Sequence, residues 1–143
     1  MDEEIYSFLL HHLQAVQEND LAVYRETTAE DLTLYEWWVT PQRLEGLPFH
    51  EFMMIANARL GTVFGAETQG QQATSRLDLA NLHIQRYGDT AIASYTLLIS
   101  TALPEGVKVV SHNESRVIVK LDGAWKIVHV HKSPSWQAPH VQP

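Results

Sequence analysis

The spacing of apolar residues divides the chain into two parts. Across most of the first sixty residues, apolar side chains recur every three to four positions, a spacing that places them on one face of a helix. After residue 74 the period is two, the alternation of a strand with one buried face. The pattern predicts helices over 3–20, 21–29 and 48–60, and strands over 31–39, 74–87, 90–103, 107–121 and 124–133.

The apolar stripes of the first and third helices indicate which face of each meets the core. The first helix has an acidic first turn, which suits the positive end of the helix dipole. The third begins beside Pro48, a residue type favoured at the first helical position, and ends before Gly61. The stripes expected to be buried are Ile5, Phe8, Leu9, Leu13 and Val16 in the first helix, and Phe49, Phe52, Met53 and Ala56 in the third.

The order of these elements predicts an α+β fold. Helices come first and a meander of four long strands follows, which is typical of helices packed on one face of an antiparallel sheet. The Asp122-Gly123 pair between two alternating segments is a strong hairpin signal. Because the strands run for 10 to 15 residues, longer than usual, the sheet is expected to bend or twist strongly. We expect one domain over residues 1–135 and an extended tail over 136–143.

Composition narrows the classes of function. The chain has 143 residues, no cysteine and a formal net charge of −7, which excludes disulfides, thiolate metal sites and cysteine nucleophiles. Its ten Lys and Arg residues are scattered, so nucleic acid is not an expected partner. No apolar run is long enough to span a membrane, and the acidic start is unlike a signal peptide. We therefore expect a cytoplasmic protein that binds neither nucleic acid nor membrane.

A His-x-His pair in the last strand is the first candidate for chemistry. His129 and His131 lie two positions apart, so their imidazoles point to the same face of the strand. Two histidines can form part of a zinc or iron site, which needs a third ligand from His112, Glu114 or His83. The same pair can instead pack and form hydrogen bonds without a metal.

Three stretches of the sequence carry a resemblance to a known family. They are LEGLPFHEF (44–52), NESRV (113–117) and DGAWKIVHVHKSP (122–134). In these stretches the chain resembles the association, or hub, domain of calcium/calmodulin-dependent protein kinase type II. More broadly, it resembles the nuclear transport factor 2-like, or SnoaL-like, superfamily. The resemblance covers residues 3–135 and implies a cone-shaped, cystatin-like fold, in which a curved antiparallel sheet wraps around helices and encloses a pocket. It also implies pairing into homodimers that can form higher oligomers, and a structural, metal-free role for the His129–His131 strand.

Four residues are expected to bind a ligand. By the resemblance, Arg116 matches a family arginine that faces the pocket and can hold a small carboxylate; an ion pair with Glu114 is the alternative. Lys132 matches a second family cation. His50 matches a family histidine at the start of the third helix, where an anion is favoured. Tyr95 is the fourth expected ligand-binding residue.

Two further features qualify the expected pocket. Alternation along the last strand places Val128 and Val130 on the same wall as Lys132, and leaves the paired histidines on the opposite face. Leu97 stands where the family has an arginine. The pocket is therefore expected to be less cationic and more apolar than that of the family.

These residues lead to two hypotheses for function. The first is a stand-alone, hub-like, non-enzymatic homodimer or higher oligomer, with a pocket for a small carboxylate or an apolar acid and with no cofactor. The dimer is expected to bury a sheet face, because both faces of 90–103 contain apolar residues. The second is a small isomerase, dehydratase or hydrolase that uses His50 or His112 as general base. Further candidates for acid–base roles under that hypothesis are Glu36, Tyr24, Tyr35 and Tyr95.

Overall fold

A computed structural model of the chain describes residues 1–60, 62–63, 66–67 and 75–135. The helices are α1 (Glu3–Glu18), α2 (Leu21–Thr27) and α3 (Leu47–Leu60). The strands are β1 (Thr28–Tyr35), β2 (Leu44–Glu45), β3 (Thr62–Val63), β4 (Ala66–Glu67), β5 (Ser75–Tyr87), β6 (Thr90–Leu103), β7 (Gly106–Leu121) and β8 (Ala124–Pro134). The tail predicted for residues 136–143 lies outside the described residues, and the domain boundary at residue 135 stays a prediction.

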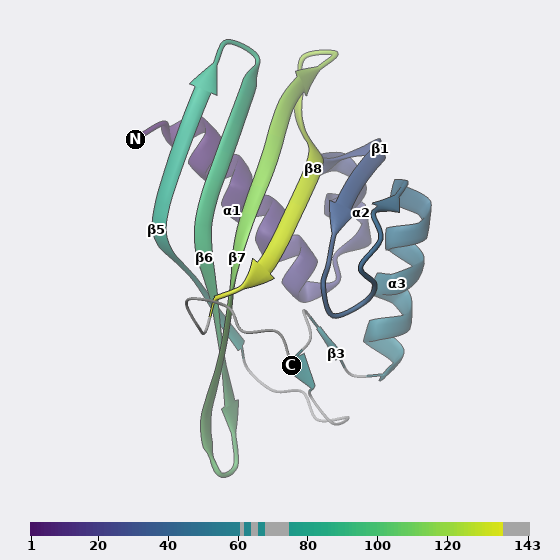
Figure 1. The fold of residues 1–143 in the computed structure, drawn as a ribbon, viewed down its shortest axis with the longest axis vertical. Coiled ribbons are helices and arrows are strands. Elements are labelled where there is room, and N and C mark those ends of the chain that lie inside the picture. The colour runs from purple at the N-terminus through teal and green to yellow at the C-terminus, as the bar shows by residue number, and fades with distance from the viewer. Residues whose placement is uncertain (61, 64–65, 68–74, 136–143) are drawn as a thin grey trace.

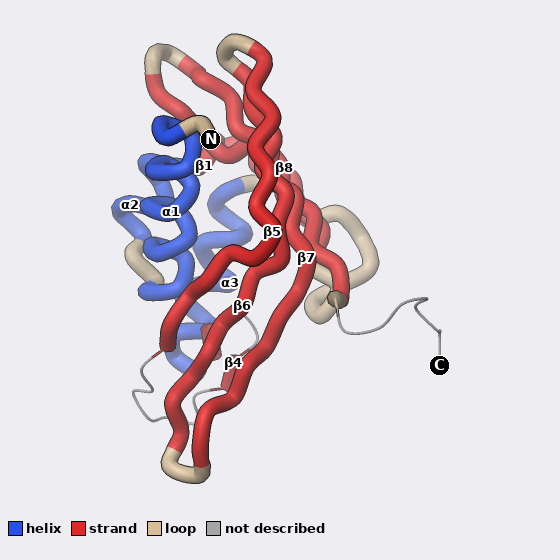
Figure 2. The backbone as a smooth tube through the Cα atoms, turned by 90° about the vertical axis from the view of Figure 1, so that its left-hand side faces the viewer, coloured by secondary structure: helices blue, strands red, loops and turns tan. Residues whose placement is uncertain are grey.

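The large sheet has six strands in the order β2-β1-β8-β7-β6-β5. β1 and β8 run parallel, whereas the other neighbouring pairs are antiparallel. The three helices lie on one face of this curved sheet, and the β6–β7 hairpin extends beyond the rest of it (Figure 1, Figure 2). The α+β fold predicted from the order of elements is therefore confirmed.

α1 begins and ends at residues that suit its termini. The Asp2 carboxylate accepts a hydrogen bond from the backbone N–H of Ile5 (3.1 Å), and Asn19 ends the helix in a left-handed conformation (φ 55°). His12 lies on the buried face and is fully buried. The members of the predicted stripe that are buried are Ile5, Leu9, Leu13 and Val16. Neither α1 nor any other helix in the described ranges is long and apolar enough to cross a membrane.

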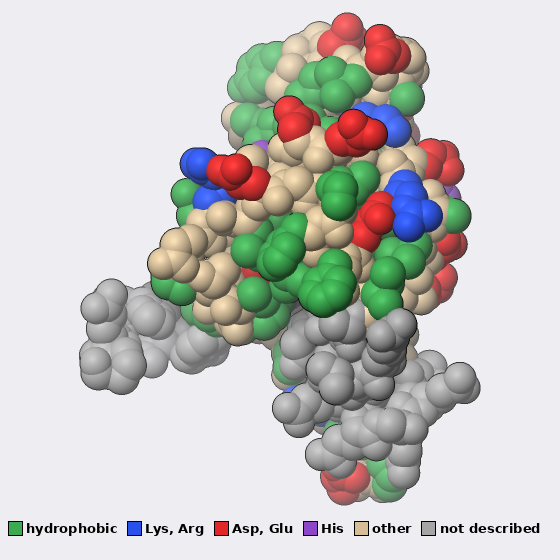
Figure 3. Space-filling view, turned by 90° about the vertical axis from the view of Figure 1, so that its right-hand side faces the viewer, with side chains coloured by type: hydrophobic (Ala, Val, Ile, Leu, Met, Phe, Trp, Pro, Cys, Tyr) green, Lys and Arg blue, Asp and Glu red, His purple; other side chains and the backbone are tan. Residues whose placement is uncertain are grey.

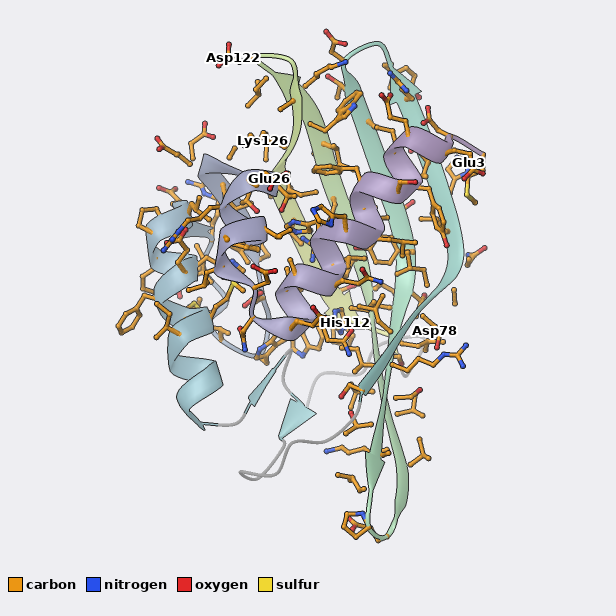
Figure 4. The ribbon with its side chains drawn as sticks, turned by 180° about the vertical axis from the view of Figure 1, so that it is seen from behind. Glu3, Glu26, Asp78, His112, Asp122 and Lys126 are labelled. Carbon is orange, nitrogen blue, oxygen red and sulfur yellow. The ribbon has the colours of Figure 1, made fainter. Side chains whose placement is uncertain are left out.

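The main hydrophobic core lies between α1 and the inner face of the sheet. β6 alternates in burial, and its inward residues Ala93, Leu97 and Ile99 belong to this core. A smaller core joins the end of α1 to α2 and α3, through Val16, Tyr24, Leu47 and Met54. The amine of Lys126 donates to the carbonyl of Glu26 (2.5 Å), which ties β8 to α2 (Figure 4). The helices are thus held against the sheet along most of its width.

The strand predicted over 31–39 ends earlier than expected. β1 stops before Glu36, and a turn follows it. Aromatic side chains are common in strands, which is why Trp37 and Trp38 indicated one. Their rings instead pack on the ring of His112, at centroid distances of 5.5 and 5.6 Å. The predicted end of this strand was therefore wrong.

The predicted orientation of α3 was also wrong. Phe49 and Phe52 face solvent, with 46% and 67% of their surface exposed, and Met53 is half-buried. Over residues 47–55, the part of this helix whose side chains the structure describes, the buried residues are Leu47, His50 and Met54. α3 is apolar on two faces, and periodicity alone does not tell which face meets the core. The side chain of Ala56 lies outside what the structure describes.

A bulge in β8 changes which residues face inward. Pairing with β7 skips Val128, which is an extra residue between Ile127 and His129. The alternation therefore shifts by one position at this point. Ile127, Val130 and Lys132 are buried, whereas Val128 is half-buried. The inward orientation predicted for Val130 and Lys132 is confirmed, and Ile127 takes the place predicted for Val128.

Candidate functional site

The four residues predicted to bind a ligand come from four elements and lie on the inner side of the sheet. Tyr95 is on β6, Arg116 on β7, Lys132 on β8 and His50 on α3, and none is more than 8% exposed. With their neighbours they form a buried polar group, which we call the inner cluster. Its members are His12, Tyr24, Glu36, His50, Tyr95, His112, Glu114, Arg116 and Lys132. Figure 4 views the molecule from the side of the helices and labels one member, His112.

Glu114 is the centre of one half of the inner cluster. Its Oε1 accepts hydrogen bonds from the Tyr95 hydroxyl (2.6 Å) and from Arg116 Nε (3.2 Å). Its Oε2 lies 2.6 Å from His112 Nε2. Burial would raise the pKa of this carboxyl, but the Arg116 charge and the His112 hydrogen bond hold the pKa well below its usual range. Glu114 is therefore a buried carboxylate opposed by a guanidinium.

The hydrogen bonds of His12 define its tautomer. The Thr27 hydroxyl donates to the Val23 carbonyl (2.9 Å), so it accepts from Nδ1–H of His12 at 2.7 Å. The other ring nitrogen, Nε2, then carries a lone pair and accepts from Arg116 Nη1 (3.1 Å). Burial lowers the pKa of His12 well below its usual value, and the Arg116 charge acts in the same direction. His12 is therefore a neutral acceptor that orients the guanidinium.

Glu36 is the centre of the other half of the inner cluster. Its Oε1 lies 2.7 Å from Lys132 Nζ and 3.5 Å from His50 Nε2. The second ring nitrogen of His50, Nδ1, forms a short hydrogen bond with the Tyr24 hydroxyl. Burial would raise the pKa of Glu36, but the Lys132 charge and the contact with His50 lower the pKa to about 2. Glu36 is therefore ionised at neutral pH.

All four predicted ligand-binding residues contact carboxylates of the chain itself. Two of them converge on Glu114 and the other two on Glu36. The ion pair between Arg116 and Glu114, the alternative raised by the sequence, is present. Leu97, which the sequence resemblance matched to a family arginine, is fully buried in the hydrophobic core. Each of the two buried cations thus lies beside a buried carboxylate, which offsets part of the free energy of removing both charges from water.

Two tryptophans connect the inner cluster with the surface. Trp37 and Trp38 follow Glu36 directly, and their rings contact each other at a centroid distance of 4.5 Å. Both pack against His112, and the amine of Lys132 lies 5.1 Å from the centre of the Trp38 ring. Each tryptophan is more than a third exposed. The turn after β1 therefore covers the Lys132 end of the inner cluster.

His12 and the two tryptophans were not predicted from the sequence as members of this site. His12 did have a signal, because it lies between Leu9 and Leu13 on the apolar stripe of the first helix. A polar side chain in such a position is buried and needs a hydrogen-bond partner. Trp37 and Trp38 had no comparable signal, because aromatic residues are common in strands and a strand was expected there.

The paired histidines of β8 lie on the outer face of the sheet. Both contact side chains of β1: His129 forms a 2.7 Å hydrogen bond with a threonine hydroxyl, and His131 packs on a tyrosine ring. Of the third metal ligands considered, His112 and Glu114 are on the inner face, and His83 is on β5, separated from β8 by two strands. In the part of the chain that the structure describes, no group of three or more acidic or histidine side chains is arranged to hold a metal ion.

The whole of this domain matches a known protein family. A family model described as the calcium/calmodulin dependent protein kinase II association domain matches residues 1–136. The chain belongs to this family. The association domain of C. elegans CaMKII has a TM-score of 0.73 and 24% identity, and the match covers 92% of this chain and 93% of that one. The CaMKII hub of S. rosetta has a TM-score of 0.69 and 23% identity, and covers 92% and 94% of the two chains.

A third solved structure has the same fold as this association domain. A nuclear transport factor 2-like superfamily protein from Salmonella enterica has a TM-score of 0.65 and 20% identity, with 95% of this chain and 92% of that chain covered. Similarity at this level of identity establishes the fold and nothing more. The nuclear transport factor 2-like fold implied by the sequence resemblance is therefore confirmed.

Proposed function

We propose that this association domain assembles with copies of itself, has no catalytic role, and binds a small acidic or apolar molecule at its inner cluster. The observation that carries the first part is membership of an association-domain family over residues 1–136. The convergence of two cations, an imidazole and a tyrosine hydroxyl in the inner cluster supports the second part. A cytoplasmic location belongs to the same proposal, and fractionation of cells that express the protein would test it.

An apolar face of α3 supports self-association. Phe49, Phe52 and Ile55 lie on one side of the helix and are 46%, 67% and 38% exposed; we call them the α3 face. Figure 3 shows hydrophobic side chains gathered on the side of the molecule where α3 lies. Grouped, exposed apolar side chains of this size typically mark a surface that binds another protein. The α3 face is therefore the favoured contact between two copies of the chain.

The outer face of the sheet is the competing surface, and it is the one expected from the sequence. In β6 the outward residues are Ile92, Ser94, Thr96, Leu98 and Ser100. Three of these five are small polar residues, and all five are half-buried. This face of β6 therefore offers less exposed apolar surface to a second copy than the α3 face does.

Phe52→Glu is expected to dissociate the assembly into monomers, because the interface would then have to bury a carboxylate without a partner. Light scattering coupled to size-exclusion chromatography measures the change in mass. Leu98→Glu, on the outer face of the sheet, is the matched control and is expected to leave the assembly intact. If Leu98→Glu dissociates it and Phe52→Glu does not, the contact is on the sheet face. A wild-type protein that stays monomeric at high micromolar concentration would contradict self-association itself.

Small carboxylates with an apolar tail are expected to raise the melting temperature of the wild-type protein. A ligand that binds the folded state stabilises it increasingly as its concentration exceeds the dissociation constant. Primary amides with the same carbon skeleton are the matched control, and their effect should be smaller because they carry no charge to pair with Lys132. A screen in which no carboxylate shifts the melting temperature would contradict the ligand part of the proposal and leave the association part standing.

A small isomerase, dehydratase or hydrolase is the second candidate function. Two buried histidines support it, because His112 Nε2 lies 2.6 Å from Glu114 and His50 Nε2 lies 3.5 Å from Glu36. A carboxylate beside an imidazole is an arrangement that can orient a general base. Turnover of a substrate that is lost in His50→Ala or His112→Ala, with the fold intact, would favour catalysis over binding alone.

A further inference from the structure

The Glu36 carboxylate occupies the position in which the inner cluster would receive a small acid. Its Oε1 contacts the Lys132 amine (2.7 Å) and the His50 imidazole (3.5 Å), two of the groups proposed to bind a ligand. We infer that Glu36 is a tethered ligand of its own site, and that a small monocarboxylate binds by displacing it from Lys132. This inference rests on the proposed ligand function, to which it adds the chemical class of the ligand and the group with which the ligand competes.

Glu36 is better placed to leave its partners than Glu114, the other carboxylate of the inner cluster. Glu114 lies in the middle of β7, which is hydrogen-bonded to β6 on one side and β8 on the other, and its carboxylate is bonded to three side chains. Glu36 follows the last residue of β1 and begins a turn, in which the Val39 N–H donates to the Glu36 carbonyl (3.0 Å). A residue that follows the last position of a strand can move outward with the turn to which it belongs, without breaking the hydrogen bonds of the sheet. Displacement of Glu36 is therefore a local movement.

The tryptophans that follow Glu36 link this exchange to the surface. Trp37 and Trp38 lie over His112 and the Lys132 amine, yet each is more than a third exposed. When Glu36 turns away from Lys132, the adjacent backbone carries the two indole rings with it and opens a route from solvent to the amine. The same movement changes the surroundings of both rings, so tryptophan fluorescence reports the exchange.

Charge balance defines the class of ligand. The inner cluster contains two cations, Arg116 and Lys132, and two carboxylates, Glu36 and Glu114. A monocarboxylate that replaces the Glu36 carboxylate keeps these buried charges balanced, whereas a phosphate or a dicarboxylate brings an additional negative charge into a buried region. The Trp38 ring lies beside the Lys132 amine, so it can pack against a short apolar tail of the bound acid. Propionate, with one carboxylate and two further carbons, is the simplest probe with both properties.

The tether weakens the binding of an external acid. A group attached to the chain by a short linker competes at an effective concentration of roughly millimolar or more. The apparent affinity of a ligand falls with the fraction of molecules whose site is open, so a site open in about one molecule in a hundred weakens binding about a hundredfold. Removal of the Glu36 carboxylate should recover the affinity that this competition costs.

Glu36→Gln removes the competing charge and keeps the shape of the side chain. We expect propionate to bind Glu36→Gln at least about tenfold more tightly than it binds the wild type, as measured by calorimetry and by tryptophan fluorescence. Glu30→Gln, at an exposed position on β1, is the matched control and should bind like the wild type. Lys132→Met, added to Glu36→Gln, should abolish the binding of propionate.

Glu36→Ala keeps the question testable if Glu36→Gln folds poorly. The alanine leaves a space of about the size of acetate, one carbon smaller than propionate, beside Lys132, and it removes the carboxylate that Lys132 contacts. Propionate in the buffer should therefore raise the melting temperature of Glu36→Ala at lower concentrations than it does for the wild type. Propionamide should have no comparable effect.

The outcomes separate this inference from the proposed function. If propionate binds the wild type and the Glu36 variants equally well, Glu36 is not a competitor and the inference is wrong, while the ligand site stands. If neither the wild type nor any Glu36 variant responds to propionate, both the ligand site and the inference are wrong. Tighter binding by the Glu36 variants that depends on Lys132 supports both.

Discussion

Arg116→Met is expected to lower the free energy of unfolding by about 3–5 kcal/mol. The guanidinium donates to Glu114, to the Tyr95 hydroxyl and to His12, and all of these groups are buried. Without Arg116 the Glu114 carboxylate stays buried and has lost its cation, whereas the methionine refills much of the space that the arginine occupied. Urea denaturation at neutral pH measures the loss.

A double-mutant cycle tests the reason for that loss. Glu114→Gln alone should also destabilise the fold, because it leaves the guanidinium buried without its carboxylate. The combined variant should cost less than the sum of the two single changes, since it removes both charges. Arg76→Met is the matched control, because the Arg76 side chain is 79% exposed and its ion pair with Asp78 contributes at most about 1 kcal/mol. A loss in Arg116→Met as small as that in Arg76→Met would contradict the role given to the buried pair.

Acidification is expected to destabilise the domain in two stages. The first stage involves His12, whose pKa in the folded state lies well below the ordinary value of 6.5. As the pH falls through 6.5, this histidine takes up a proton in the unfolded chain but not in the folded one, so the folded state loses stability. The second involves Glu36, whose pKa is about 2 in the folded state against an ordinary 4.5. The stability that comes from ionised Glu36 is complete above pH 4.5 and is lost as the pH falls towards 2. It amounts to about 3 kcal/mol, and Glu114 acts in the same direction.

Variants assign each stage of the acid response to its residue. Glu36→Gln should flatten the dependence of unfolding free energy on pH below 4.5, and His12→Asn should flatten the earlier part. Urea denaturation at a series of pH values, or melting temperatures over the same series, measures both. A wild-type protein whose stability is constant or rises between pH 7 and pH 3 would contradict the ionised, paired state of Glu36.

The long strands of the sheet were predictable because their signals are local. Period-two alternation and turn pairs such as Asp122-Gly123 locate the strands of the meander to within about one residue of where they lie. The bulge at Val128 had no such signal, because a bulge depends on the pairing of two strands rather than on one of them. Because of this one extra residue, Ile127 lies on the inner face, where Val128 was predicted.

The inner cluster was only half predictable, for a related reason. Family resemblance named Arg116, Lys132 and His50 as ligand-binding residues, and strand alternation placed Val130 on the same face as Lys132. The carboxylates that they contact depend on tertiary packing. Glu36 meets Lys132 because a parallel β1 lies beside β8, an arrangement that neither segment specifies alone. The buried side of α3 is likewise decided by its contacts with α1 and α2 rather than by its own periodicity.

The residues of the inner cluster are brought together across nearly the whole length of the chain. Lys132 and Glu36 are 96 positions apart, and Arg116 and His12 are 104 positions apart. Contacts of such separation form slowly, because a long loop must close before the contact can stabilise it. During synthesis α1, α2 and α3 leave the ribosome before the strands that cover them, so His12 and Glu36 stay in water until β8 has emerged. Folding of the newly made chain, and any assembly that requires the folded domain, therefore waits for the last strand.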